Sequence, residues 1–91
     1  MYSIVTSRTF LRKSGRFFRK HPELADRFRR LVEELRNDPF QPYLRLHALR
    51  GELQGLHAVN LTHAYRVIVA LDVAESVILL IDIGSHDEVY R

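Results

Sequence analysis

The sequence contains no cysteine, and no lysine follows Lys20. Without cysteine, neither a disulfide framework nor a thiolate metal site can form, which suits a reducing compartment. No apolar run is long enough for the core of a signal peptide or for a membrane-spanning helix. We therefore expect a cytoplasmic protein that does not enter a membrane.

Several widespread catalytic motifs are also missing. The sequence has no glycine-rich phosphate loop, no nucleophile-elbow pattern and no histidine pair at the helical spacing of a metal site. A zinc site built from several histidines has no supporting spacing either. We expect no bound metal and no cofactor.

Length and composition indicate one folded unit. The chain has 91 residues, of which 46% are hydrophobic, so we expect a single domain over residues 1–91. The first half has the periodicity of a helical hairpin: Phe10 and Phe17, and likewise Leu11 and Phe18, are seven residues apart. Pro22 suits the first turn of a second helix, whose apolar residues recur every three or four positions.

The second half of the chain has the pattern of strands. We expect strands near residues 44–49, 56–62, 65–71 and 77–83, with a further short strand within residues 2–6. The short connections imply antiparallel pairing. The sequence thus predicts an α+β fold, in which an N-terminal strand and a two-helix hairpin pack on a four- to five-stranded, mostly antiparallel sheet.

The last two predicted strands are apolar on both faces. One helical hairpin can cover only one face of such a sheet, so part of the other face needs a second cover. An apolar patch left on that face would be a binding surface for a partner.

Basic residues gather in the first part of the chain. Six of the 14 lie between Arg8 and Lys20, a segment that contains no acid. Such a helix has two interpretations, a solvated surface or a stripe that binds a polyanion through salt-dependent contacts. The residues we assign to RNA or ribosome binding are Arg12, Lys13, Arg16, Arg19, Lys20, Arg27 and Arg30.

Histidines and arginines interrupt the apolar strands. A histidine can transfer a proton at neutral pH, and an arginine can stabilise the charge of a phosphorane-like transition state. Cleavage of RNA by its own 2′-hydroxyl needs a base, an acid and a phosphate clamp. The candidates for these roles are His47, Arg50, His63, Arg66, His86 and Tyr90.

Each candidate also has a structural interpretation. His57, on the same side of its strand as Val59, suits packing better than chemistry, and His63 falls in a turn where histidine is common. Arg66 could instead form an ion pair with Asp82 or Asp72.

The C-terminal segment Ser85-His86-Asp87-Glu88 fits a helix capping box. In one helical turn, His86 and Tyr90 are four residues apart and would share a face, while the two acids would complement the helix N-terminus. We therefore expect the chain to present an imidazole and a phenol beside the sheet.

On these segments the chain resembles the RelE/ParE superfamily of toxins from bacterial toxin–antitoxin modules. The similarity covers nearly the whole length: the basic hairpin, then HALRGELQGLHAVNL, AYRVIVALD and LLIDIGSHDEVY. The strand that ends in Gly-x-His-x-x-x-aromatic, and His47 followed by x-Leu-x-Gly, are typical of the YafQ-like branch. The Tyr-Arg-Val-Ile block resembles the wider RelE pattern.

The resemblance implies a microbial RNase-like fold that enters the ribosomal A site and cuts mRNA. It would make His86 the leading acid or base, Arg66 the transition-state clamp and Tyr90 a residue that stacks on or orients a base, with His47 and Arg50 alongside. Asn60 and Ala64 stand where YafQ-like toxins usually carry a histidine and an acid. The general base is therefore left open between His47 and His63.

Three functions follow as hypotheses. The first is a ribosome-dependent endoribonuclease toxin, and the second is a ParE-like inhibitor of DNA gyrase on the same scaffold. The third is an inactive relative or a plain nucleic-acid-binding module that uses the basic helices alone. His86 and Tyr90 favour the nuclease, because ParE-like toxins generally lack such a cluster. The family also implies a cognate antitoxin protein as partner, besides the ribosome and mRNA.

Overall fold

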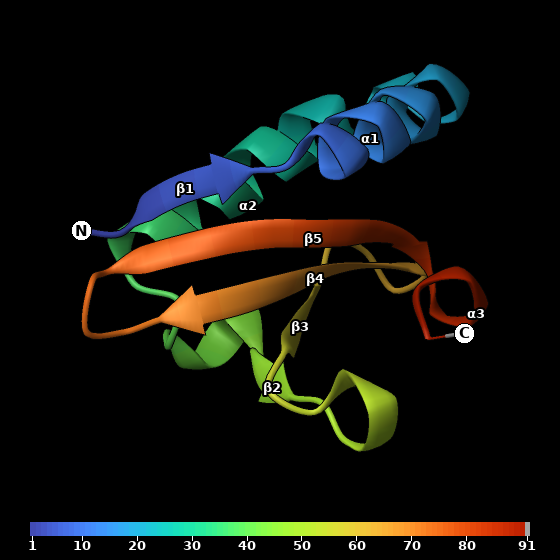
Figure 1. Cartoon of the computed structure of the whole chain (residues 1–91). Helices are drawn as coiled ribbons and strands as arrows, with labels where there is room; N and C mark the ends of the chain where they lie inside the picture. Colours follow the sequence, from blue (N-terminus) through green and yellow to red (C-terminus); the bar gives the residue numbers. More distant parts are fainter. Residues whose placement is uncertain (91) are drawn as a thin grey trace.

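A five-stranded sheet in the order β1-β5-β4-β3-β2 forms the centre of the computed structural model, which describes residues 1–90 (Figure 1). The strands are β1 (Ser3–Thr6), β2 (His47–Ala48), β3 (His57–Asn60), β4 (Tyr65–Asp72) and β5 (Val77–Ser85). β1 runs parallel to β5, and the other neighbouring pairs are antiparallel. The α+β fold with a mostly antiparallel sheet, predicted from the sequence, is confirmed.

Two helices follow β1 and form the predicted hairpin. They are α1 (Arg8–Lys20) and α2 (Ala25–Asn37), joined by the 3-10 turn η1 (Pro22–Leu24). The Ser7 side chain caps α1 by accepting a hydrogen bond from the Phe10 N–H at 3.0 Å. Phe10 and Phe17 are buried as expected, but Leu11 is 58% exposed, so its assignment to the apolar stripe was wrong. Ser14 lies between the two buried phenylalanines instead, because residues four and seven apart share a helix face.

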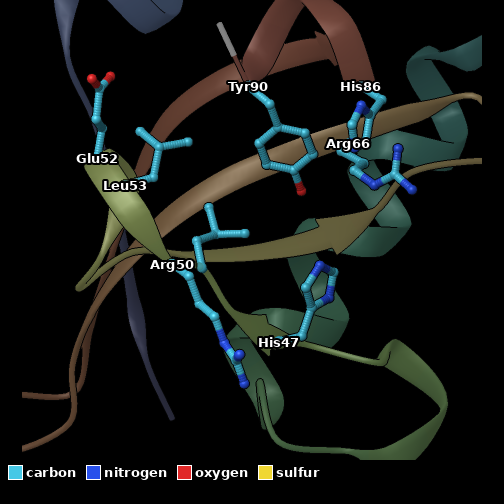
Figure 2. A pocket seen from close by; sticks show the side chains of 8 residues that line it. His47, Arg50, Glu52, Leu53, Arg66, His86 and Tyr90 are labelled. Atoms are coloured by element: carbon cyan, nitrogen blue, oxygen red, sulfur yellow. The ribbon is translucent and has the colours of Figure 1, made fainter.

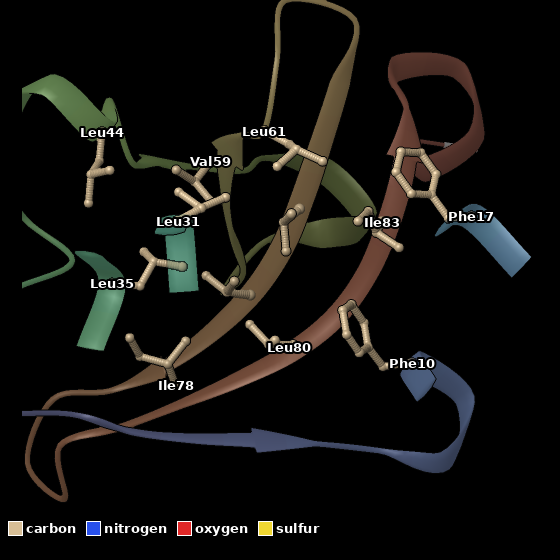
Figure 3. Packing of buried hydrophobic residues seen from close by; sticks show 12 residues of the cluster. Phe10, Phe17, Leu31, Leu35, Leu44, Val59, Leu61, Ile78, Leu80 and Ile83 are labelled. Carbon is tan, nitrogen blue, oxygen red and sulfur yellow. The ribbon is translucent and has the colours of Figure 1, made fainter. Parts of the chain in front are cut away.

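The main core lies between this hairpin and the sheet (Figure 3). Phe10 and Phe17 of α1 and Leu31 and Leu35 of α2 pack on residues of β3, β4 and β5, and Leu35 is fully buried. This packing leaves the opposite face of the sheet free for the site described below.

β2 is much shorter than the predicted strand over residues 44–49. The 3-10 turn η2 (Pro42–Leu44) occupies its beginning, and Arg45 adopts a left-handed backbone with φ of 52°. Proline fixes the backbone in a turn conformation, and a left-handed residue cannot continue a strand. Only His47 and Ala48 therefore pair with β3.

The second face of the sheet has its own cover at one end. The short helix α3 (His86–Val89) places Val89 against Ala58 and Ile68, all at most 6% exposed, and Leu49 and Leu56 pack beside them. The second cover expected from the sequence is therefore the C-terminal turn together with the segment around the 3-10 turn η3 (Gly51–Leu53).

At the other end of this face, a row of apolar residues stays partly exposed. Val5, Leu79 and Ala70 are register partners across β1, β5 and β4, and Val5 is 45% exposed. The open apolar patch is thus smaller than the sequence suggests. None of the helices among residues 1–90 is long and apolar enough to cross a membrane.

Candidate active site

Five of the six candidate catalytic residues line one surface pocket of about 560 Å³ on the second face of the sheet. β2 supplies His47, the following segment Arg50, and β4 Arg66, while His86 and Tyr90 come from α3 and its end. In Figure 2, His47 lies on one side of the pocket, and Tyr90, His86 and Arg66 lie on the other. The Arg50 guanidinium points away from Tyr90 in the same view (Figure 2). Pairing of β2 with β3 and of β3 with β4 joins the two sides.

The α3 turn that carries His86 and Tyr90 is held by the predicted capping box. The Ser85 hydroxyl accepts a hydrogen bond from the Glu88 N–H at 3.3 Å, and the Glu88 carboxylate accepts one from the Ser85 N–H at 2.8 Å. The His86 and Tyr90 rings then meet edge to face, with centroids 4.4 Å apart. The C-terminal segment is therefore an ordered turn that presents an imidazole and a phenol, as expected.

The penultimate residue of β5 is Gly84, and the structure shows why a glycine is needed there. It is the register partner of Arg66, and α3 folds back directly over it. A Cβ atom at this position would lie 3.1 Å from Glu88 Oε1 and 3.4 Å from Val89 Cγ1, so any side chain would press on the turn. The glycine lets α3 approach the sheet closely enough for Tyr90, which contacts His86, to lie near Arg66.

Arg66 faces the pocket without a carboxylate partner among residues 1–90. Its guanidinium carbon lies 5.9 Å from the centre of the Tyr90 ring, within the range of a cation–π contact. Asp82 pairs with Lys13 instead, at 3.3 Å, and Asp72 accepts a hydrogen bond from the Glu75 N–H. The alternative of an ion pair between Arg66 and either acid was wrong. Its charge therefore remains available to an anionic ligand.

The hydrogen bond of His47 defines its tautomer. Its Nδ1 lies 3.0 Å from the backbone carbonyl oxygen of Arg45. Because a carbonyl can only accept, Nδ1 must carry the proton, and in the neutral ring Nε2 is then an acceptor. An exposed imidazole with a free Nε2 lone pair can remove a proton from a hydroxyl group.

The environment of His86 is different. Its Nδ1 lies 3.7 Å from Asp87 Oδ1, within reach of an ion pair when the ring is protonated. The Asp87 side chain is 98% exposed, so this pair adds little to stability. In its protonated form His86 is a proton donor on the side of the pocket opposite His47.

His63 does not join this group. It lines a second pocket with Arg27, Arg30, Tyr43 and Arg45, among other residues. His57 also stays apart: it pairs with the buried Val69 on β4, and its buried Nδ1 has no hydrogen-bond partner within residues 1–90. The structure thus agrees with the packing interpretation of His57.

Three pocket residues were not identified from the sequence. Leu49, Glu52 and Leu53 line the first pocket between β2 and β3. Glu52 and Leu53 lie in η3, which begins at Gly51 with φ of 69°. The glycines that bracket this segment were the available signal, since they mark a turn rather than a continuing strand.

The basic residues of α1 are exposed and lie on one broad side of the helix. Arg12, Arg16 and Arg19 follow one another at steps of four and three residues, and Lys13 and Lys20 flank them. Lys13, Arg16 and Lys20 line a third pocket, which also contains Asp82. Arg27 and Arg30 belong to the second pocket. The predicted binding residues therefore divide between two surfaces, one on α1 and one beside α2. Within residues 1–90, no three histidine, aspartate or glutamate side chains gather to hold a metal ion.

Comparison with solved structures shows a shared fold at low identity. The chain matches YafQ from E. coli strain BL21(DE3) with a TM-score of 0.81 at 15% identity, over 100% of both chains. It matches a metal-bound toxin from Helicobacter pylori with a TM-score of 0.80 at 24% identity, over 97% of this chain and 98% of that one.

A third match is YafQ within the E. coli DinJ–YafQ complex, with a TM-score of 0.79 at 15% identity over 100% of both chains. No protein-family model matches the sequence, and no curated protein matches it. The chain therefore has the fold of YafQ-type toxins, which confirms the fold expected from the RelE/ParE resemblance.

Proposed function

We propose that this protein is the toxin of a toxin–antitoxin module, an endoribonuclease that cuts mRNA on the ribosome. The observation that carries the proposal is the convergence of His47, Arg66, His86 and Tyr90 on one pocket. These side chains combine a proton acceptor, a proton donor and a phosphate-binding cation around one space. The YafQ-type fold supports the same function. Ribosomes would place its activity in the cytoplasm.

In the proposed reaction, His47 Nε2 takes the proton of a ribose 2′-hydroxyl. The O2′ atom attacks the adjacent phosphorus, and the bond from phosphorus to O5′ breaks. His86 gives its proton to the departing O5′, which leaves a 2′,3′-cyclic phosphate and a free 5′-hydroxyl. We assign the base to His47, because its Nδ1–H donates to the Arg45 carbonyl and leaves Nε2 as an acceptor, and the acid to His86, because it lies on the opposite side of the pocket.

Arg66 would stabilise the negative charge that develops on the phosphoryl oxygens. Its guanidinium offers several fixed donors, and no carboxylate among residues 1–90 competes for them. Tyr90, held against both His86 and Arg66, would stack on or orient a base beside the cleaved bond. Arg50, at the edge of the pocket, would contact a neighbouring phosphate.

The direct experiment is to induce the protein in bacterial cells and to sequence RNA ends while monitoring chromosome integrity. The proposal expects cuts within translated transcripts, at positions in frame with the ribosome, and no DNA breaks. DNA breaks with intact transcripts would support the gyrase inhibitor instead. Purified protein on ribosomes programmed with a defined mRNA would then show whether the ribosome is required.

An antitoxin is the partner that this function implies. The YafQ of the similar complex is bound to DinJ. In the present protein, Val5, Leu79 and Ala70 form a partly exposed apolar surface on which a partner could pack. We expect a small protein, encoded beside this one, to pack an amphipathic segment on that surface and to pair its acids with the basic helices. Co-expression followed by purification of one tagged partner tests this. A toxin that is always recovered alone would contradict it.

Ribosome binding should weaken steeply with salt, because exposed arginines and lysines of α1 would neutralise RNA phosphates. Changing Arg12, Arg16 and Arg19 together to Glu should lower the affinity by about tenfold or more. The rate of cleavage in bound complexes should not change, since none of the three lines the first pocket. Sedimentation of the protein with ribosomes at several salt concentrations measures both affinity and slope. A ribosome affinity that does not change with salt concentration would mean that these residues are exposed to water but do not contact RNA phosphates.

A further inference from the structure

The second pocket combines positive charge with an exposed aromatic ring. It has a volume of about 520 Å³ and lies between α2, the η2 segment and the turn after β3. Its charged lining consists of three arginines, Arg27, Arg30 and Arg45, and one acid, Glu34. The balance of positive charge favours an anionic ligand.

The arginines of this pocket are not neutralised within the protein. Among residues 1–90, the salt bridges of α2 join Arg29 to Asp26 and Arg36 to Glu33, on another side of the helix from the pocket. Arg27, Arg30 and Arg45 are exposed and have no carboxylate within salt-bridge distance in the same part of the chain. Three unpaired guanidinium groups around one hollow are a typical phosphate-binding arrangement.

The one acid of the pocket is engaged with Tyr43. A hydrogen bond from the Tyr43 hydroxyl to the Glu34 carboxylate raises the pKa of that phenol above its ordinary value. Tyr43 is nevertheless 62% exposed, which leaves an aromatic surface at the rim of the pocket. An exposed tyrosine beside guanidinium groups can stack on a base of a single-stranded nucleic acid.

The second pocket adjoins the first. Asn60, which lines the second, is the register partner of Arg66, which lines the first, so the two residues are neighbours across β3 and β4. The Arg45 carbonyl of the second pocket also accepts the hydrogen bond of His47 in the first. The segment between α2 and β2 and the end of β3 line the second pocket together.

We propose that the second pocket binds a nucleotide that flanks the cleaved bond in the same RNA strand. The arginines would hold its phosphate, and Tyr43 would stack on its base. A strand held in both pockets would pass over the end of β3, between Asn60 and Arg66. The substrate is then a single-stranded segment longer than the dinucleotide that contains the cleaved bond. This inference rests on the proposed nuclease function.

Binding of a fluorescent hexanucleotide that carries 2′-deoxyribose throughout tests the inference without any cleavage. Arg27→Ala with Arg30→Ala should lower the affinity by about tenfold and reduce the slope of log affinity against log salt by about 1.4, since each neutralised single-strand phosphate contributes about 0.7. Arg29→Ala with Arg36→Ala is the matched control, because it removes two charges from the same helix outside the pocket. It should leave affinity and slope nearly unchanged.

Substitution of Tyr43 separates stacking from charge. Tyr43→Phe keeps the ring and should keep most of the affinity, whereas Tyr43→Ala should lose about tenfold, the scale of one base stacked on an aromatic ring. Circular dichroism of each variant checks the fold; Arg27, Arg29, Arg30 and Tyr43 are exposed, and Arg36 is partly exposed.

The two proposals fail in different ways. Suppose that the unmodified protein cleaves mRNA, but that the Arg27→Ala/Arg30→Ala variant has the same hexanucleotide affinity and salt slope as the Arg29→Ala/Arg36→Ala variant. The second pocket is then not a nucleotide site. If the unmodified protein cleaves no RNA on programmed ribosomes, the nuclease function itself is wrong. Equal affinities of Tyr43→Ala and the unmodified protein would remove the stacking contact.

Discussion

Replacing His86 or Arg66 by alanine should each lower the rate of RNA cleavage by about 10²-fold or more, the usual scale for a proton donor or a charge-stabilising group. Neither change should unfold the protein, because His86 is exposed and Arg66 points into the pocket from β4. The measurement is single-turnover cleavage of mRNA on programmed ribosomes. Arg29→Ala, a salt-bridged arginine on α2, is the control and should cleave normally. Normal turnover of both site variants would remove their catalytic roles.

The same assay can separate the acid from the base. His47→Asn keeps a side-chain N–H that can donate to the Arg45 carbonyl but lacks the Nε2 acceptor, so it should lose activity as His86→Ala does. A substrate with sulfur in place of the O5′ atom has a leaving group that needs no proton. It should restore cleavage by His86→Ala but not by His47→Asn. The opposite pattern of rescue would exchange the two roles.

Gly84→Val should abolish most cleavage although Gly84 performs no chemistry. The new side chain would push against Glu88 and Val89, and α3 would have to move away from the sheet. His86 and Tyr90 would then lose their positions relative to Arg66, and a displacement of about 1 Å can cost about 10²-fold in rate. The variant should keep its far-UV circular dichroism but lose the nuclear Overhauser contacts between the His86 and Tyr90 rings.

Gly15→Ala is the matched control for this substitution. A Cβ atom at Gly15 meets only Arg19 Nη1, at 3.9 Å, which is ordinary contact. Alanine inside α1 should stabilise the helix by about 0.5–1 kcal/mol without changing cleavage. If Gly84→Val cleaves as well as Gly15→Ala does, the close approach of α3 to β5 is not needed for activity.

Local signals predicted much of this molecule. The Ser85–Glu88 capping box is complete within four residues, so the sequence alone indicated the α3 turn and the contact between His86 and Tyr90. The helices could be predicted equally well from the sequence, because buried residues such as Phe10 and Phe17 recur at helical spacing.

What the sequence could not predict depends on contacts between distant segments. The ion pair between Lys13 and Asp82, for example, follows from the packing of α1 on β5. The separation of His63 from the other candidates arises because the turn after β3 faces α2 rather than α3. The left-handed Arg45 makes β2 begin later than predicted, and arginine gives no local sign of that conformation.

The parallel pairing of β1 with β5 joins the first strand of the chain to the last. We expect such a long-range pairing to form late in folding, because closing a long loop costs conformational entropy before the contacts between its ends can form. α3 follows directly from β5, and Gly84 near the end of that strand is the register partner of Arg66. The position of His86 in the pocket therefore depends on β5, the strand that also pairs with β1. We expect partly folded chains to be unable to cut RNA. Substitutions that destabilise β1 should therefore abolish cleavage, although no β1 residue lines the pocket. Refolding should be followed in parallel by RNA cleavage and by hydrogen exchange in β1. We expect cleavage to return at the same time as β1 becomes protected from exchange.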